Sequence, residues 1–272
     1  MGMSIADALG EAKGELNPSD LYYLLGYSLR RDRTFLLSHP EYEISHLEWL
    51  RWRRMKRRRI KGMPAAYLTG EKEFYGISFH VNRHTLIPRP ETELLVDEVI
   101  HRHPASVLDM GTGSGCIAVA LAMHLPGCRI TAVDISRRAL AMARRNALRH
   151  VGPGQIQFVR SEYFNRIGSA RYEIIVANPP YVREGDVEQL EPSVAAYEPG
   201  VALYAGRDGL QAYRHILREG SNYLVPGGAI ILEIAPDLST KVQELAREHG
   251  YRKEKIERDL SGMVRMIVLV SS

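Results

Sequence analysis

The stretch "VLDMGTGSGC", residues 107–116, decides the fold, because it reads as a buried strand, a glycine-rich loop and the start of a helix. Gly111, Gly113 and Gly115 allow the backbone to turn tightly and to approach a ligand closely. Their G-x-G-x-G spacing differs from the G-x-G-x-x-G fingerprint that binds a pyrophosphate. Asp134 closes the next predicted strand, where an acid can accept hydrogen bonds from both ribose hydroxyls of an adenosine. Together these features predict an adenosine-containing cofactor at the edge of a sheet.

The chain repeats this order of strand, loop and helix from residue 89 onward. Apolar runs predict strands at 105–110, 129–135, 156–164, 172–181, 227–235, 255–260 and 265–270. Amphipathic segments predict helices at 116–125, 136–150, 209–224 and 238–250. Such alternation is typical of an α/β fold with a doubly wound, mostly parallel sheet that helices cover on both faces. Ligands of these sheets bind at the carboxyl ends of the strands.

The part of the chain before residue 89 follows other patterns. In residues 1–70 apolar residues recur at steps of three and four, which predicts a small helical N-terminal domain for substrate recognition. Residues 71–88 alternate between apolar and polar side chains and predict a β-hairpin connector, with its turn near "VNRH" at 81–84. Residues 89–272 form the α/β domain in this division.

Composition excludes several classes of protein. No apolar run approaches 18 residues, so no membrane span is predicted, and the N-terminus lacks the basic-then-apolar pattern of a secretion signal. Cys116 and Cys128 are too few for a disulfide framework, and we expect a monomer in the cytoplasm. The 10 histidines show no metal-ligand spacing, so we expect no metal.

Positive charge is concentrated in "RWRRMKRRRIK", Arg51–Lys61, which holds eight Lys or Arg residues and no acid. The whole chain has 36 Lys+Arg against 32 Asp+Glu, so acids outnumber bases outside this run. The run suits contact with nucleic acid or with an acidic protein surface. It equally suits a solvated helix face, with Trp49, Trp52, Met55 and Ile60 turned inward.

The stretch "VANPPYV", residues 176–182, ends a predicted strand beside the cofactor loop. Pro179 fixes its own φ and pushes Asn178 toward an extended conformation. The Asn178 side-chain oxygen and the Pro179 carbonyl would then be two acceptors at a fixed separation, which suits an NH₂ group. Tyr181 would supply a flat wall against a planar amide or base. A proline-rich turn without a chemical role is the simpler alternative.

The motifs, taken in order, resemble the HemK/PrmC family of peptide chain release factor N5-glutamine methyltransferases. They are "LIPRPETE" (86–93), "VLDMGTGSGCIA" (107–118), "VANPPYV" and "EPGVALYAGRDGL" (198–210), and the resemblance covers nearly the whole chain. It implies a seven-stranded Rossmann-like domain that uses S-adenosyl-L-methionine and releases S-adenosyl-L-homocysteine. It also implies class 1 release factors as partners, methylated at the glutamine of their Gly-Gly-Gln motif, a step linked to translation termination.

The resemblance also implies roles for individual residues. Expected cofactor-binding residues are Gly111, Thr112, Gly113, Ser114 and Gly115 at the methionine end, Asp134 at the ribose, Tyr163 at the adenine, and Asn178. The substrate glutamine would be held by Asn178, Pro179, Pro180 and Tyr181, among which Asn178, Pro179 and Tyr181 are the expected catalytic residues. Tyr163 stands where the family often has Trp.

Some residues have a less definite role. Glu162 is expected near the adenine amino group, and Asp109 is expected to anchor the loop amides or the ligand's amino group. Arg89 and Glu91 either border the pocket or only favour the start of a helix. Two segments depart from the family pattern, "EIAPDLS" (233–239) with Ala235 in place of Gly, and "GMVRMIVLV" (262–270) without the usual Asp-Arg pair. We expect these departures to alter packing rather than chemistry.

Two other functions stay open. An N6-adenine methyltransferase acting on DNA or RNA would hold an amino group on a planar ring in the same way, in a pocket that receives a flipped base. The basic run favours this alternative, although release-factor methylation does not require nucleic-acid contact through Arg51–Lys61. A cofactor-binding protein that only docks through its basic arm is the third hypothesis.

Overall fold

A computed structural model describes residues 3–271 of the chain, which fall into two compact units. The smaller unit runs to Glu71 and also takes in the later segment Glu191–Tyr197. The larger unit comprises Lys72–Leu190 and continues from Glu198 onward. No pattern in the sequence signals that residues 191–197 group with the N-terminal helices.

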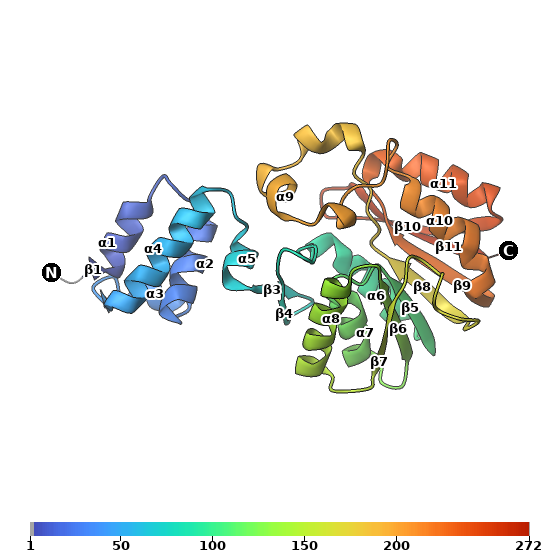
Figure 1. Ribbon diagram of the computed structural model, residues 1–272, viewed down its shortest axis with the longest axis horizontal. Helices are drawn as coiled ribbons and strands as arrows, with labels where there is room; N and C mark the ends of the chain where they lie inside the picture. The colour runs from blue at the N-terminus through green and yellow to red at the C-terminus, as the bar shows by residue number, and fades with distance from the viewer. Residues whose placement is uncertain (1–2, 272) are drawn as a thin grey trace. The chain divides into compact units, whose positions relative to one another are not determined.

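The larger unit is built on a seven-stranded sheet with the strand order β10-β11-β9-β8-β5-β6-β7 (Figure 1). The strands are β5 (Ser106–Met110), β6 (Arg129–Asp134), β7 (Ile156–Arg160), β8 (Tyr172–Ala177), β9 (Leu224–Glu233), β10 (Tyr251–Arg258) and β11 (Val264–Ser271). Neighbours from β9 to β7 are parallel, whereas β11 is antiparallel to β9 and β10. The predicted mostly parallel sheet is therefore confirmed.

Helices cover both faces of this sheet. They are α6 (Glu93–Arg102), α7 (Cys116–His124), α8 (Arg137–His150), α10 (Gln211–Gly220) and α11 (Ser239–Glu248). In β8, Ile174 and Val176 face the core formed with α6, α7 and α8, whereas Ile175 and Ala177 face the core formed with α10 and α11. Strand residues alternate between faces, so a strand covered on both sides is apolar throughout. Figure 1 shows the two helical layers on opposite sides of the sheet.

The order of the strands places the two loops of interest beside each other. Met110 and Ala177, the last residues of β5 and β8, are paired in register. The loop that begins with Gly111 and the segment that begins with Asn178 therefore leave the sheet at neighbouring points. The helix after β5 covers one face and α10 covers the other, and a crevice for ligands forms where helices diverge in this way.

The predicted β-hairpin occurs at β3 (Glu71–Phe74) and β4 (Ile77–His80), but its turn is not at residues 81–84. The turn is Tyr75–Gly76, whose φ angles of 53° and 69° are both positive. Two positive φ angles are what a two-residue type I′ hairpin turn requires. Phe74 and Phe79 are buried in the core beside α6 and α7, so the hairpin contributes to the core of the larger unit.

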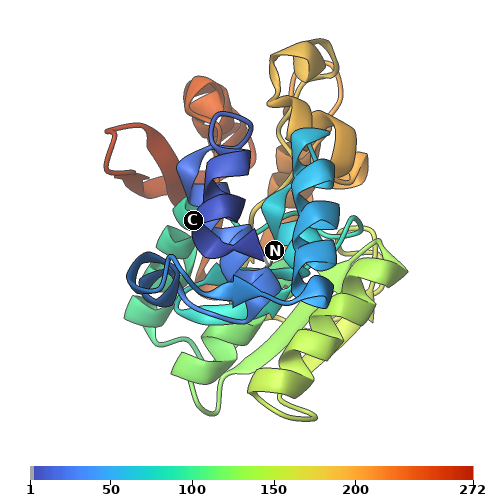
Figure 2. The ribbon, with the colours of Figure 1, turned by 90° about the vertical axis from the view of Figure 1, so that its left-hand side faces the viewer.

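The smaller unit is mainly helical, as predicted for residues 1–70. Its elements are β1 (Met3–Ser4), α1 (Ile5–Ala12), α2 (Pro18–Leu29), α3 (Arg33–Ser38), β2 (Glu43–Ile44), α4 (His46–Ile60), α5 (Ala65–Thr69) and α9 (Pro192–Tyr197). Ser45 and Glu48 form a reciprocal capping box at the start of α4. Trp52 is fully buried in the core that joins α1, α2 and α4, and Figure 2 shows these helices in dark blue to cyan.

Short 3-10 helices occur in the connecting segments of the larger unit. They are η1 (Pro90–Thr92), η2 (Glu184–Gln189), η3 (Gly200–Ala202), η4 (Ser221–Tyr223) and η5 (Pro236–Leu238). η1 leads directly into α6, and η3 lies in the "EPGVALYAGRDGL" segment. Both segments contribute to the site described below.

Candidate active site

A cavity of about 270 Å³ opens in the larger unit at the carboxyl ends of β5, β6 and β8. Segments far apart in sequence form its wall. Predicted site residues that line it are Gly111, Gly113, Asp134, Tyr163, Asn178, Pro179 and Pro180. The fold therefore gathers most of the expected cofactor and substrate residues in one place.

Gly111 and Gly113 are the loop glycines that face the cavity, and both have positive φ, 76° and 57°. A Cβ added to Gly111 would meet no protein atom within 4 Å, so the space in front of it is open to a ligand. The main-chain N–H groups of Gly111 and Thr112 both donate to the Val133 carbonyl at 2.9 Å. These bonds tie the loop to the end of β6.

Thr112, Ser114 and Gly115 do not line the cavity, which differs from the expectation. Thr112 donates its hydroxyl to Asp109 at 2.6 Å, and Ser114 is buried. A Cβ on Gly115 would lie 3.0 Å from the Cβ of Ala143 in α8, so close packing and a φ of 82° both favour glycine here. The three residues fix the loop in place instead of lining the cavity.

Asp109 holds the glycine loop by accepting from the Thr112 hydroxyl, whereas it was expected to anchor the loop amides or the ligand's amino group. The Asp109 side chain is fully buried, and burial raises its pKa to about 7. Its position under the loop keeps it outside the lining of the cavity.

Asp134 lies at the end of β6 with its carboxylate on the cavity wall. One oxygen accepts from the N–H of Gly113 at 2.9 Å and the other from the N–H of Ser136 at 2.8 Å. Burial raises the pKa of Asp134, and these two N–H groups act in the opposite direction. Each oxygen keeps a lone pair, so the carboxylate can still accept from ribose hydroxyls.

Tyr163 contributes an aromatic ring to the cavity, and Glu162 beside it also lines the wall. The Tyr163 ring is stacked on His215 of α10, with centroids 4.6 Å apart and planes 14° from parallel. β7 ends at Arg160, whereas the strand was expected to continue to residue 164. The chain leaves the sheet early, and Tyr163 takes a φ of 44°.

The segment after β8 brings Asn178, Pro179 and Pro180 to the cavity, but Tyr181 does not line it. Tyr181 packs against the core beside α10 and α11, and burial raises its pKa to about 12. Its carbonyl oxygen would be 2.7 Å from a Cβ on Gly209, so the two chain segments pass close together there. The expected wall formed by Tyr181 is not observed.

Two buried residues that the sequence did not single out lie behind Asn178. The amide Nδ2 of Asn178 donates to the hydroxyl of Thr92 at 3.0 Å, and that hydroxyl donates to the carboxylate of Glu233 at 2.6 Å. Thr92 is 2% exposed and Glu233 is 3% exposed. Burial raises the pKa of Glu233 to about 7. An acid inside the apolar run "GGAIILEIA" was the signal available for Glu233.

Neither Arg89 nor Glu91 lines the cavity. Arg89 instead pairs with the carboxylate of Glu198 at 2.5 Å, and Glu198 also accepts from the N–H of Ile87 at 3.1 Å. The Glu198 side chain is almost fully buried, and the next residue, Pro199, lines the cavity. The pair therefore joins "LIPRP" to "EPGVA" and supports one cavity wall from behind. His84, Thr85 and Leu86 complete this side. Leu86 begins the "LIPRPETE" motif, whereas no role had been expected for any of the three.

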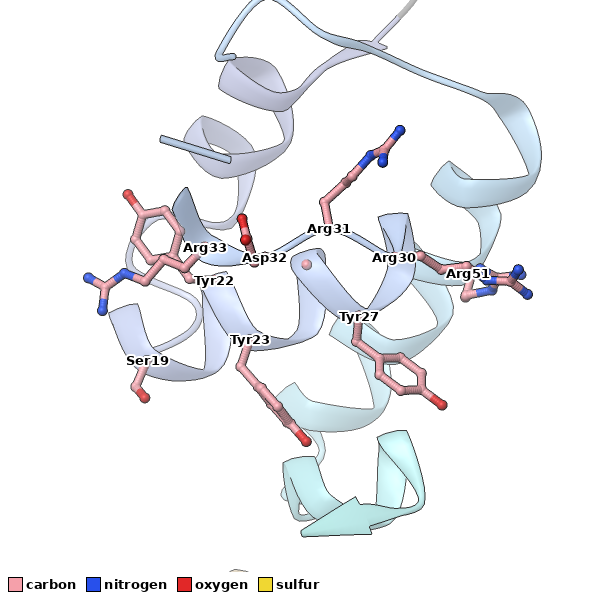
Figure 3. A pocket seen from close by; sticks show the side chains of 10 residues that line it. Ser19, Tyr22, Tyr23, Tyr27, Arg30, Arg31, Asp32, Arg33 and Arg51 are labelled. Atoms are coloured by element: carbon pink, nitrogen blue, oxygen red, sulfur yellow. The ribbon is translucent and has the colours of Figure 1, made fainter. Parts of the chain in front are cut away.

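The smaller unit carries a hollow of its own, of about 740 Å³ (Figure 3). Its lining includes the α2 tyrosines and nearby arginines, namely Tyr22, Tyr23, Tyr27, Arg30, Arg31, Arg33 and Arg51. Tyr27 donates its hydroxyl to the main-chain oxygen of Thr69 at 2.7 Å, and Arg33 lies over the Tyr22 ring at 4.9 Å. The hollow therefore presents aromatic rings and guanidinium groups together.

Six of the eight basic residues of the run Arg51–Lys61 fall into two sets on α4. Lys56 is buried and pairs with Glu11 at 3.1 Å and Glu15 at 2.6 Å, and Arg59 pairs with Asp20 at 2.7 Å. These charges stabilise the helical unit. Four arginines are exposed and have no carboxylate partner within residues 3–271, namely Arg53, Arg54, Arg57 and Arg58. The second set remains available for a partner.

Within the described chain, no helix is both long enough and apolar enough to cross a bilayer. Across residues 3–271, no three His, Cys, Asp or Glu side chains gather as a metal site would require. A reaction without a metal stays a prediction.

Comparisons with known proteins match both units. Residues 4–70 match the model of the PrmC N-terminal domain, and residues 90–193 match that of the methyltransferase small domain. A methyltransferase from Pyrococcus furiosus of known crystal structure shares the fold, with a TM-score of 0.56 and 18% identity over 74% of this chain and 92% of that one.

Curated relatives agree with these matches. The chain is 33% identical to the "Bifunctional methyltransferase" of Rickettsia felis, across 98% of its own length but only 58% of that protein. It is 39% identical to the "Release factor glutamine methyltransferase" of Koribacter versatilis, over 90% of this chain and 88% of that protein. The extent of this second match shows that the chain belongs to the family of release factor glutamine methyltransferases.

Proposed function

We propose that this protein transfers a methyl group from S-adenosylmethionine to the side-chain nitrogen of the glutamine in the Gly-Gly-Gln motif of class 1 release factors. One observation carries the proposal: Gly111 and Gly113 line the same cavity as Asn178 and Pro179. The first pair suits a cofactor and the second suits an NH₂ group. Because release factors act on ribosomes, we place the reaction in the cytoplasm.

The residues of the cavity fit the cofactor. Gly111 leaves open space, Asp134 keeps lone pairs for the ribose, and Tyr163 offers a ring for the adenine. S-adenosylmethionine supplies an electrophilic methyl group on a positively charged sulfur. Among the described residues that line the cavity there is no Lys or Arg, whereas Asp134 and Glu162 are acidic. This charge balance favours a cationic ligand.

An amide nitrogen is a weak nucleophile because its lone pair is delocalised. The Asn-Pro-Pro segment would compensate for this by holding the nitrogen in position. Asn178 Oδ1 and the Pro179 carbonyl would accept from the two N–H bonds of the substrate amide and aim its nitrogen at the methyl group. Correct placement of two reacting groups lowers the barrier by roughly 7–11 kcal/mol. Acceptors held in place also stabilise the positive charge that develops on nitrogen.

The smaller unit supports a role in holding the release factor. Four exposed arginines lie on α4, namely Arg53, Arg54, Arg57 and Arg58. Arg51 of the same helix lines the hollow that contains the α2 tyrosines. We infer that an acidic surface of the release factor docks here. The same arginines would suit RNA, which keeps the adenine alternative open. Binding that weakens with salt for the release factor but not for RNA would support the first assignment.

Methyl transfer from labelled S-adenosylmethionine tests the proposed reaction. The substrates are a bacterial release factor, the same factor with Gly-Gly-Ala in place of Gly-Gly-Gln, and single-stranded and duplex nucleic acids. Label only on the intact factor is the expected result. Label on nucleic acid would instead assign the protein to the adenine class, and cofactor binding without any transfer would leave only a docking function.

A further inference from the structure

Three side chains from separate elements form a hydrogen-bonded row, of which Thr92 and Glu233 are buried. Asn178 follows β8, Thr92 ends η1 at the start of α6, and Glu233 is the last residue of β9. Asn178 Nδ2 lies 3.0 Å from Thr92 Oγ1, which lies 2.6 Å from Glu233 Oε2. Asn178 is the member of the row that lines the cavity.

The donors and acceptors of this row fix the direction of the Asn178 amide. A threonine hydroxyl has one hydrogen, and an ionised carboxylate can only accept. Thr92 therefore gives its hydrogen to Glu233 and can only accept from Asn178. If the amide were reversed, Asn178 Oδ1 would face Thr92 Oγ1 with no hydrogen between them. While Glu233 is ionised, the NH₂ group must therefore face Thr92, which turns Oδ1 the other way.

The turned oxygen remains available. Within residues 3–271, no protein group donates a hydrogen bond to Oδ1 of Asn178. The substrate amide needs an acceptor at this position, whereas an NH₂ group there would repel it.

We propose that Thr92 and Glu233 are positioning residues that hold the Asn178 amide with Oδ1 toward the substrate nitrogen. This inference rests on the proposed methyl transfer. Neither residue touches the reacting atoms in this assignment. Both act through Asn178.

The direction that this row imposes on the Asn178 amide depends on the charge of Glu233. Glu233 is surrounded by Glu91 on η1, Arg89 before it, Arg265 on β11 and the phenol of Tyr181, and Tyr213 of α10 donates to its main-chain oxygen at 3.0 Å. Burial and Glu91 favour the neutral acid, whereas the two arginines and the Thr92 hydroxyl favour the carboxylate.

Protonation of Glu233 would remove the directional constraint. A neutral carboxyl can donate to Thr92, which frees the Thr92 hydrogen to point at Asn178. The amide could then turn its oxygen inward and present NH₂ to the cavity. Burial places the Glu233 pKa at about 7, so this change falls near neutral pH. Turnover should therefore fall as the pH decreases through this range.

Substitutions at the two positions separate positioning from folding. Thr92→Val keeps the shape and removes the hydroxyl, Thr92→Ser keeps the hydroxyl, and Glu233→Gln removes the charge. We expect Thr92→Val to lower kcat on the release factor by about 10- to 100-fold, less than the roughly 10²- to 10³-fold loss caused by removing a preorganised hydrogen-bonding group itself. The cofactor Kd from calorimetry should stay within about twofold, and Thr92→Ser should recover most of kcat. The fall in kcat as the pH decreases through about 7 should occur in the wild type and be absent from Glu233→Gln.

An NMR measurement on the ¹⁵N-labelled protein gives a readout that needs no substrate. The side-chain NH₂ signals of Asn178, identified by their loss in Asn178→Ala, should titrate near neutral pH in the wild type and not in Glu233→Gln. A wild-type kcat in a folded Thr92→Val variant, or an unchanged titration in Glu233→Gln, would overturn the inference. Failure of the wild type to methylate the release factor would instead overturn the proposed function, and the NMR result would still decide the positioning.

Discussion

The side-chain amide of Asn178 is hydrogen-bonded to the hydroxyl of Thr92, 86 residues earlier in the chain, at 3.0 Å. The residue expected to hold the substrate is therefore not oriented by its own strand and prolines alone. The start of α6 and the end of β9 contribute through Thr92 and Glu233. Three elements that meet at one edge of the sheet set the direction of one amide.

Replacement of Asn178 by Ala should reduce methyl transfer far more than cofactor binding, to which Asn178 is only one of several expected contributors. The substitution removes the Oδ1 acceptor but leaves Gly111, Asp134 and Tyr163 in place. Loss of one preorganised group of this kind costs about 10²- to 10³-fold in kcat. Single-turnover methylation and calorimetric titration with the cofactor measure the two effects separately. Turnover equal to that of the wild type would contradict the proposed role of Asn178.

The loop glycines should respond differently to replacement by alanine. Gly111→Ala adds a methyl group where no protein atom lies within 4 Å, so it should mainly weaken cofactor binding. Gly115→Ala adds a methyl group 3.0 Å from the Ala143 Cβ, so it should mainly lower the free energy of unfolding. Both have positive φ, so each also incurs strain of order 1–3 kcal/mol.

Urea unfolding and cofactor titration of the two glycine variants make the comparison. Both variants incur similar backbone strain. A difference between them in cofactor affinity or in the free energy of unfolding therefore reflects the space around each residue. A larger loss of cofactor affinity in Gly115→Ala than in Gly111→Ala, with both proteins folded, would show that Gly115 contacts the ligand after all.

Tyr163→Ala should raise the Kd for S-adenosylmethionine by about tenfold, which corresponds to about 1.4 kcal/mol. Stacking of a base on an aromatic ring contributes about 1–3 kcal/mol. His215→Ala is the matched control, because it removes the ring stacked behind Tyr163 without touching the cavity lining. It should raise Kd less, by loosening Tyr163. Equal affinities in the wild type and Tyr163→Ala would remove Tyr163 from the adenine site.

The order of strands and helices in the larger unit could be predicted because each signal is local. An apolar run bounded by turn residues indicates a buried strand, and Gly111 to Gly115 mark a loop wherever they occur. The hairpin turn was misplaced because Tyr75–Gly76 has little turn signal before the Gly, whereas "VNRH" looks like a turn. The bounds of β7 were also wrong, since Tyr163 leaves the strand to reach the cavity.

The parts of the site that escaped prediction depend on contacts between distant segments. Thr92 and Glu233 are ordinary residues until the sheet places them beside Asn178, and the pair of Arg89 with Glu198 joins positions 109 residues apart. Tyr181 follows Asn178 closely in sequence, yet its partly buried side chain packs against the core and does not line the cavity. Sequence proximity predicted a shared role for all four residues of the motif, but only Asn178, Pro179 and Pro180 line the cavity.

Glu233→Gln should change how stability depends on pH. The ordinary pKa of this carboxyl is 4.5, and burial raises it to about 7 in the folded protein. The folded state therefore holds the proton more tightly than the unfolded chain. This contribution to stability is fully present below about pH 4.5 and is lost as the pH rises through about 7. Between pH 5.5 and 8 the wild type should lose about 2 kcal/mol from this group alone.

Urea unfolding of the wild type and of Glu233→Gln at a series of pH values measures this loss. The variant should keep the loss that arises from Asp109, whose pKa burial also raises to about 7, and should lack the part due to Glu233. Parallel pH profiles for the two proteins would contradict the assignment. The ionisation that costs stability is the one that holds the Asn178 amide in its productive direction. In the wild type, turnover should therefore rise over the same pH range in which ionisation of Glu233 lowers the free energy of unfolding. In Glu233→Gln neither of these two changes should occur.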